Sequence, residues 1–353
     1  MAPRKKEAPS AGSASSAPRK SNLLQDYPEA VVLKLLVESR HPAERFAVVV
    51  FLSLALSSAL FTLTSRATLG ELGSVSKHLE EWWEVAGLVA WKAVEVGLAW
   101  FLGFDARDVT SFMFLTHLPT YALLASFYNI RPTSILLSYA ITVFTTSIPF
   151  MLLRLPAAFH NSMNAPAVAN RAILQDRLTT IYTTVAATAI FTTVLSLSYA
   201  SFLPTRLVLH FQDIPDITAV HAGPEGLPIL FLALLPAGCA ARDFLFVSSA
   251  GAATAEKERT QKGAGQQDAP REGEYLACAV YRKTWGRLST KTKVLAGRTL
   301  VLAAVLLLNT IVQVAGTVNG VDVEGAAVWG GVWAAGTVAV GTLFGWIEGV
   351  DGV

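Results

Sequence analysis

The sequence has few charged residues and few cysteines. Asp, Glu, Lys and Arg make up only 15% of its 353 residues, whereas an average soluble domain has about a quarter. This low charge excludes an ordinary water-soluble domain as the main part of the chain. The two cysteines, Cys239 in an apolar segment and Cys278 in a basic one, offer neither a disulfide framework nor a metal-ligand spacing.

The sequence signatures of common enzymes are also absent. There is no Walker A phosphate loop, no G-x-S-x-G elbow, no H-E-x-x-H motif and no Cys/His cluster. The Asp-rich pattern of phosphatidyl-alcohol transferases and the His-plus-acid patterns of membrane acyltransferases are missing as well. We therefore expect no catalytic residues, no metal and no cofactor, and we interpret the chain as non-enzymatic. A membrane enzyme that acts on lipid through His117 or a loop histidine is a third alternative.

Long apolar stretches dominate what the sequence does contain. Hydrophobic residues make up 52% of the chain, and the mean hydropathy is +0.46. A bilayer core of about 30 Å needs about 20 apolar helical residues. The sequence therefore predicts an all-α, polytopic transmembrane helical bundle of about eight spans. These spans are expected at 45–64, 83–104, 109–128, 134–153, 178–202, 226–247, 296–317 and 325–347.

The second predicted span is the weakest, because it carries Glu84, Lys92 and Glu95. It can also be read as an amphipathic helix in the membrane interface. With eight spans and a cytosolic start, 22 of the 28 Lys and Arg residues lie on the cytosolic side. Removing the second span would move the basic loop at 250–295 outside, against the positive-inside rule. The positive-inside rule therefore favours an even number of spans in which the second segment crosses the membrane, with both termini cytosolic.

The chain divides into four predicted regions. Residues 1–40 form a disordered basic cytosolic tail, with a mitochondrial transit peptide as the alternative. Three prolines among its first 18 residues work against the amphipathic helix that such a peptide needs. Spans one to six occupy 45–247, and a basic, partly disordered cytosolic loop occupies 248–295. The last two spans form a hairpin at 296–347.

Three ionisable residues lie deep inside predicted spans. Lys92 and Glu95 are three residues apart on the second span, and His117 lies near the middle of the third. The short connection at 105–108 predicts that these helices are antiparallel neighbours, so that the three residues meet near the midplane. Ionisable groups in a bilayer are costly. One interpretation is an ion- or proton-linked site or a lipid-headgroup pocket, and the other is a contact that fastens two helices.

Polar and small residues at helical spacing predict close helix packing. Asn309 and Gln313 share a face of the seventh span, a spacing that suits hydrogen bonds to a neighbouring helix. A ladder of hydroxyls runs along the fifth span at Thr180, Thr184, Thr188, Thr192 and Ser196. The last span has two stripes of small residues, Gly331, Ala335 and Ala339, and Gly341, Gly345 and Gly349. Such stripes let backbones approach closely, within the chain or against a partner.

These features predict a multi-pass protein of the endoplasmic reticulum or nuclear envelope that acts as a subunit, scaffold or biogenesis factor, with a mitochondrial membrane as the alternative location. Its expected partners are the lipid bilayer and other membrane proteins. The basic cytosolic segments suit anionic lipid or acidic or RNA-containing partners, without sequence-specific nucleic-acid binding. The alternative function is a transporter or lipid-handling protein built around Lys92, Glu95 and His117.

Overall fold

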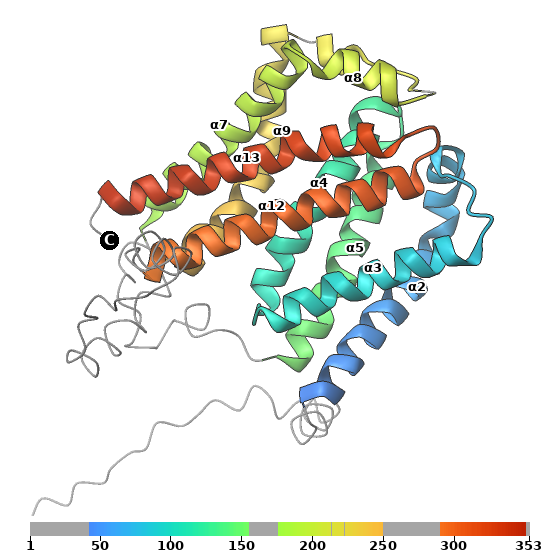
Figure 1. Cartoon of the computed structure of the whole chain (residues 1–353), viewed down its shortest axis with the longest axis horizontal. Helices are drawn as coiled ribbons and strands as arrows, with labels where there is room; N and C mark the ends of the chain where they lie inside the picture. Colours follow the sequence, from blue (N-terminus) through green and yellow to red (C-terminus); the bar gives the residue numbers. More distant parts are fainter. Residues whose placement is uncertain (1–41, 155–175, 213, 222, 250–289, 351–353) are drawn as a thin grey trace, which may run out of the picture. The chain divides into compact units, whose positions relative to one another are not determined.

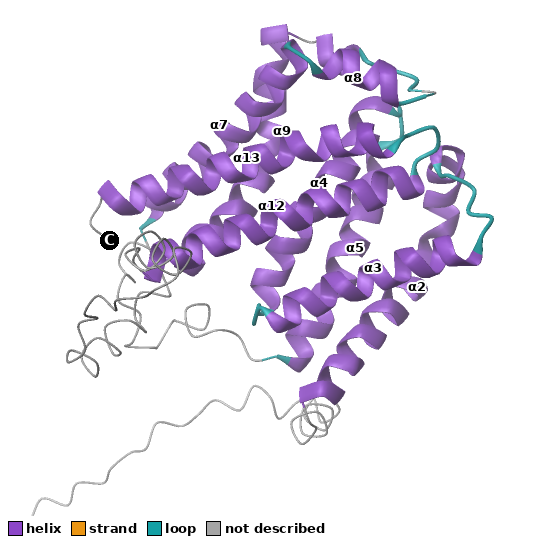
Figure 2. Cartoon of the chain, viewed as in Figure 1, coloured by secondary structure: helices purple, strands orange, loops and turns teal. Residues whose placement is uncertain are grey.

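Helices account for the regular structure of the described residues. The computed structural model describes residues 42–154, 176–212, 214–221, 223–249 and 290–350. These residues contain no strand beyond two isolated β-bridges, and Figure 2 shows them as helices joined by short loops. The all-α prediction is therefore confirmed for this part of the chain. The predicted tail at 1–40 and most of the predicted loop at 248–295 lie outside the described residues.

Each predicted span corresponds to one helix, although the boundaries differ. The first helix extends to Val75 rather than to residue 64, and the first helix of the last hairpin begins at Thr290 rather than at residue 296. The helices labelled in Figure 1 are α2 (Pro42–Val75), α3 (Trp82–Phe101), α4 (Ala106–Phe127), α5 (Pro132–Leu153), α7 (Arg177–Ala200), α8 (Leu203–His210), α9 (Leu227–Ala241), α12 (Thr290–Thr317) and α13 (Val323–Val350). A π-helical turn, η3 (Arg242–Val247), continues α9.

Six of the described helices are long and apolar enough to cross a membrane, namely α2, α5, α7, α9 with η3, α12 and α13. The other two candidates, α3 and α4, have 20 and 22 residues, which corresponds to about 30–33 Å of helix. Three charged residues interrupt α3, and a histidine, a proline and several hydroxyls lower the hydropathy of α4. The count of eight spans therefore stays a prediction. The two helices that fall short, α3 and α4, carry Lys92, Glu95 and His117.

One end of the bundle is held together by backbone bridges, and we call it the bridge end. The β-bridge Ser76–Val318 joins the connection after α2 to the turn between α12 and α13. A second bridge, Phe211–Val321, joins the end of α8 to the same turn. The start of α5 also lies here, because the Arg131 backbone N–H donates to the Glu71 carboxylate at 3.1 Å. The loops predicted to be non-cytosolic thus gather at one end.

The opposite end, which we call the aspartate end, is held together by side chains around Asp108 at the start of α4. Arg298 near the start of α12 donates to Asp108 at 2.8 Å, and Ser248 after η3 donates to it at 3.2 Å. At the end of α5, Arg154 donates to the Trp100 carbonyl of α3 at 3.1 Å. Connections predicted to be cytosolic meet here. Both α3 and α4 run between the same two ends as the six apolar helices.

The described helices pack mainly in pairs. In Figure 1, α12 and α13 run side by side as an antiparallel hairpin, α7 packs on α9, and α2 packs on α5. The connected helices α3 and α4 make few close backbone contacts with each other, since α4 packs mainly on α5 and α12, whereas α3 packs on α2 and α12. The turn between them contains Gly103, whose φ of +81° is a conformation that glycine adopts readily. Beyond the turn, long side chains join the two helices.

Candidate functional site

The structure brings the three predicted ionisable residues together. Lys92 Nζ lies 3.3 Å from Glu95 Oε2, and the same oxygen lies 3.4 Å from Nε2 of His117. The i,i+3 spacing on α3 places the first two on one face, and α4 supplies the third. The Glu95 side chain is fully buried, while that of Lys92 keeps 16% of its surface exposed. The carboxylate is therefore shared between a cation and an imidazole inside the bundle.

Asn309 of α12 fixes the orientation of the histidine ring. The Trp91 indole N–H donates to Asn309 Oδ1 at 2.9 Å, and because an indole nitrogen only donates, this contact identifies the amide oxygen. The amide nitrogen then donates to the Thr116 carbonyl at 3.0 Å and faces His117 Nδ1 at 3.3 Å. An Nδ1 that accepts carries no proton, so the ring is neutral and its proton sits on Nε2, facing Glu95.

Several buried atoms of this cluster have no hydrogen-bond partner among the described residues. They include Glu95 Oε1, Thr116 Oγ1 and His117 Nε2, whose contact with Glu95 has ion-pair distance without hydrogen-bond geometry. Burying a polar group without a partner costs about 1–3 kcal/mol. Such groups in native proteins are usually reached by water or by a ligand. The cluster thus has spare hydrogen-bonding capacity.

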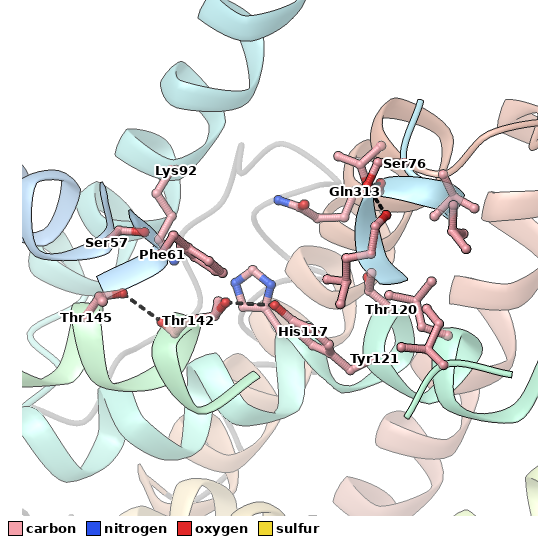
Figure 3. A pocket seen from close by; sticks show the side chains of 16 residues that line it. Ser57, Phe61, Ser76, Lys92, His117, Thr120, Tyr121, Thr142, Thr145 and Gln313 are labelled. Carbon is pink, nitrogen blue, oxygen red and sulfur yellow. Dashed lines mark hydrogen bonds between the residues drawn. The ribbon is translucent and has the colours of Figure 1, made fainter. Parts of the chain in front are cut away.

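A pocket of about 250 Å³ adjoins the cluster and extends to the bridge end. Figure 3 shows His117 between Lys92 on one side and Ser76 and Gln313 on the other. The pocket lies among α2, α3, α4, α5 and α12. Its polar lining residues are Ser57, Ser76, Lys92, His117, Thr120, Tyr121, Thr142, Thr145, Gln313 and Thr317, and its apolar ones are Phe61, Leu72, Val75, Leu124, Ile130 and Val318.

The residues predicted to lie on helix-packing faces fall in different surroundings. Asn309 is fully buried in the cluster, while Gln313, one turn further along α12, lines the pocket. A Cβ on Gly341 would lie 2.4 Å from the Thr299 side chain, and one on Gly345 would lie 3.6 Å from the Leu295 side chain. That stripe therefore faces α12. In contrast, a Cβ on Gly331 would meet no atom within 4 Å, and Ala335 is exposed, with Ala339 half-buried.

The ion pair at the aspartate end was not predicted as a site. Asp108 is 2% exposed, and the Arg298 guanidinium also lies 5.0 Å from the ring centres of Phe104 and Phe244. The sequence placed Asp108 in a short connection and Arg298 at the beginning of the seventh predicted span, and the two residues are 190 positions apart. Their only sequence signal is that each lies at the edge of a predicted span. We interpret this buried pair as a clamp between α4, η3 and α12.

Outside the apolar spans, one titratable pair fixes the start of α13. Asp322 accepts a hydrogen bond from the Gly325 backbone N–H at 2.7 Å, and its other oxygen lies 2.9 Å from His210 Nδ1. The Gly325 hydrogen bond and the His210 contact hold the pKa of Asp322 below its ordinary value. Among the described residues, no group of three His, Cys, Asp or Glu side chains is placed to hold a metal ion.

Comparison with known proteins identifies a similarity over part of the chain. No curated protein and no solved structure matches it. A family model described as the Bouquet formation protein 3 C-terminal domain matches residues 176–312. The match runs from the start of α7 into α12, and it includes Asn309 and Arg298, whose partners on α4 lie outside it. Residues 176–312, less than half of the chain, are thus similar to that C-terminal domain.

Proposed function

We propose that this chain is a multi-pass protein of the nuclear envelope and the adjoining endoplasmic reticulum, and that it acts without catalysis as a scaffold, complex subunit or biogenesis factor. The observation that carries the proposal is the similarity of residues 176–312 to the Bouquet formation protein 3 C-terminal domain. Helices apolar enough to cross a membrane support it as well. The similarity favours the nuclear envelope over the mitochondrial alternative.

A scaffold needs a surface that another membrane protein can reach. The outer face of α13 supports this requirement, because Gly331, Ala335 and Ala339 follow one another at four-residue spacing, and nothing in the described bundle contacts a Cβ at Gly331. Small residues let a second helix approach closely in a bilayer, where apolar burial itself gives no driving force. The basic segments outside the described residues would add contacts to anionic lipid or acidic partners.

The location is tested by imaging the tagged full-length chain, expressed at its natural level, together with markers for the nuclear envelope, the endoplasmic reticulum and mitochondria. We expect a nuclear rim with reticular signal. Exclusive overlap with the mitochondrial marker would contradict the proposal. The partner is tested by crosslinking in intact cells, followed by purification in mild detergent and quantitative mass spectrometry. An unrelated multi-pass protein serves as the background control.

We expect at least one membrane protein to be recovered reproducibly. Ala335→Phe should then reduce its recovery, because the larger side chain keeps a partner helix away from the small-residue stripe. Ala233→Phe is the matched control, since Ala233 is also exposed but lies on α9. Recovery of the chain alone, at the size of a monomer in detergent, would overturn the scaffold role. An equal loss of partner recovery in both variants would show that α13 is not the contact face.

A further inference from the structure

The pocket beside the polar cluster has an unusual charge distribution. Of its lining residues, Lys92 is the only one with a formal charge, and no carboxylate lines it. Glu95 contacts Lys92 from outside the lining, and His117 is neutral because Asn309 donates to its Nδ1. The cluster as a whole is therefore uncharged, although its pocket side presents a cation.

The same pocket presents more hydrogen-bond donors than the described residues satisfy. Thr120 Oγ1 is buried without a hydrogen-bond partner. The Lys92 ammonium has three N–H groups, of which one is directed to Glu95 and one to the Met113 sulfur at 4.0 Å, so one remains for a ligand. The Gln313 amide adds two further N–H groups to the lining. A matching ligand therefore supplies oxygen atoms that accept hydrogen bonds.

The charge balance decides which kind of oxygen fits. An anionic oxygen would leave one net negative charge inside the bundle, near Glu95, and desolvating an unbalanced ion costs several kcal/mol. A neutral hydroxyl or carbonyl oxygen satisfies the same donors without that cost. The apolar part of the wall, with Phe61, Leu124 and Ile130, suits hydrocarbon. At about 250 Å³ the pocket is smaller than most ligand sites, which occupy roughly 300–1,000 Å³.

We infer that the pocket binds the uncharged, oxygen-bearing head of a neutral lipid, such as a sterol or a diacylglycerol, whose hydrocarbon continues into the bilayer. Ser57 and Phe61 of the wall belong to α2, the most exposed of the six apolar helices, so a lipid at the surface of the bundle can reach the wall of the pocket along this helix. This binding site goes beyond the scaffold role and does not depend on it. A scaffold that loses its lipid can still retain its protein partner.

The experiment uses the purified full-length protein in nanodiscs containing one of three photoreactive, clickable lipids. The probes are a sterol, a diacylglycerol and a phosphatidic acid of matched chain length. We expect a neutral probe to label peptides of α4 and α12 that line the pocket, more strongly than phosphatidic acid does. Stronger labelling by one of the two neutral probes shows whether the pocket prefers a sterol or a diacylglycerol. Stronger labelling of these peptides by phosphatidic acid would overturn the inference, as would labelling confined to other helices.

Variants connect the labelling to the pocket. Thr120→Val keeps the shape of the side chain but removes the unpartnered hydroxyl, so labelling should fall roughly fivefold, as for one lost hydrogen bond. Thr120→Ser should keep it. Thr193→Val is the matched control, because this exposed threonine on α7 donates only to the Ala189 carbonyl. Melting temperatures verify that each variant is folded. Unchanged labelling in a folded Thr120→Val protein would contradict the inference.

Discussion

At the scale of single residues, Asn309 organises the polar cluster. Its oxygen accepts from Trp91, and its nitrogen donates to the Thr116 carbonyl and to His117. Three groups from two other helices thus depend on one amide. The sequence identified Asn309 as a helix-packing residue from its spacing with Gln313, but not the Trp91 contact, since Trp91 and Asn309 are 218 positions apart.

Replacing Asn309 by Leu should lower the free energy of unfolding by about 1–3 kcal/mol, because the part-buried Trp91 N–H and the buried Thr116 carbonyl lose their partner. Gln313→Leu is the control on the same helix face. It makes none of these three contacts and lines the pocket instead, so its melting temperature should stay near that of the parent. Thermal unfolding in detergent, followed by tryptophan fluorescence, measures both. Equal melting temperatures for the two variants would contradict this role for Asn309.

At the scale of helices, close approach depends on which glycine faces which neighbour. The hydroxyl ladder of α7 contacts Gly238 of α9, where an added Cβ would lie 2.1 Å from Thr188 Oγ1 and 2.7 Å from the Thr184 carbonyl. The two stripes of α13 look alike in sequence, yet one faces α12 and the other faces outward. Helical spacing identifies the stripes, whereas only packing decides which one remains available to a partner.

Gly238→Ala should destabilise the protein, because the new Cβ overlaps both α7 atoms, and overpacking of this kind costs about 1–3 kcal/mol. Gly297→Ala in α12 is the matched control, since its Cβ would meet no atom within 4 Å. Alanine at an open helical position should instead stabilise by about 0.5–1 kcal/mol. The melting temperatures of the two variants should therefore shift in opposite directions. A stabilising Gly238→Ala would refute the close contact between α7 and α9.

At the scale of the whole bundle, the connections of the described residues gather at two ends, and α3 and α4 run between them. Whether these two helices cross the membrane decides the side on which their short turn lies. With eight spans, the turn at 102–105 lies on the same side as the start of α7. With six spans, α3 and α4 together would remain on the side of the loop after α2.

Cysteine labelling distinguishes the two topologies. In a chain whose Cys239 and Cys278 are replaced by Ser, we introduce Leu102→Cys, Arg177→Cys or Glu80→Cys, each at an exposed position. In sealed microsomes with the cytosolic face outward, a membrane-impermeant maleimide should modify the cysteines at 102 and 177. The cysteine at 80 should react only after permeabilisation. Protection of the cysteine at 102 together with that at 80 would establish six spans.

The sequence by itself determined the helical class, the approximate positions of the long helices and the identity of the ionisable residues within them. These properties depend on local hydropathy, helical spacing and the placement of charge, all of which are readable along the chain. Only the tertiary structure decided that Lys92 and His117 contact the same oxygen of Glu95. It also decided that Trp91 and Asn309 orient the His117 ring and that a pocket adjoins these residues. Contacts between distant segments depend on which helices pack together, and hydropathy does not encode that choice.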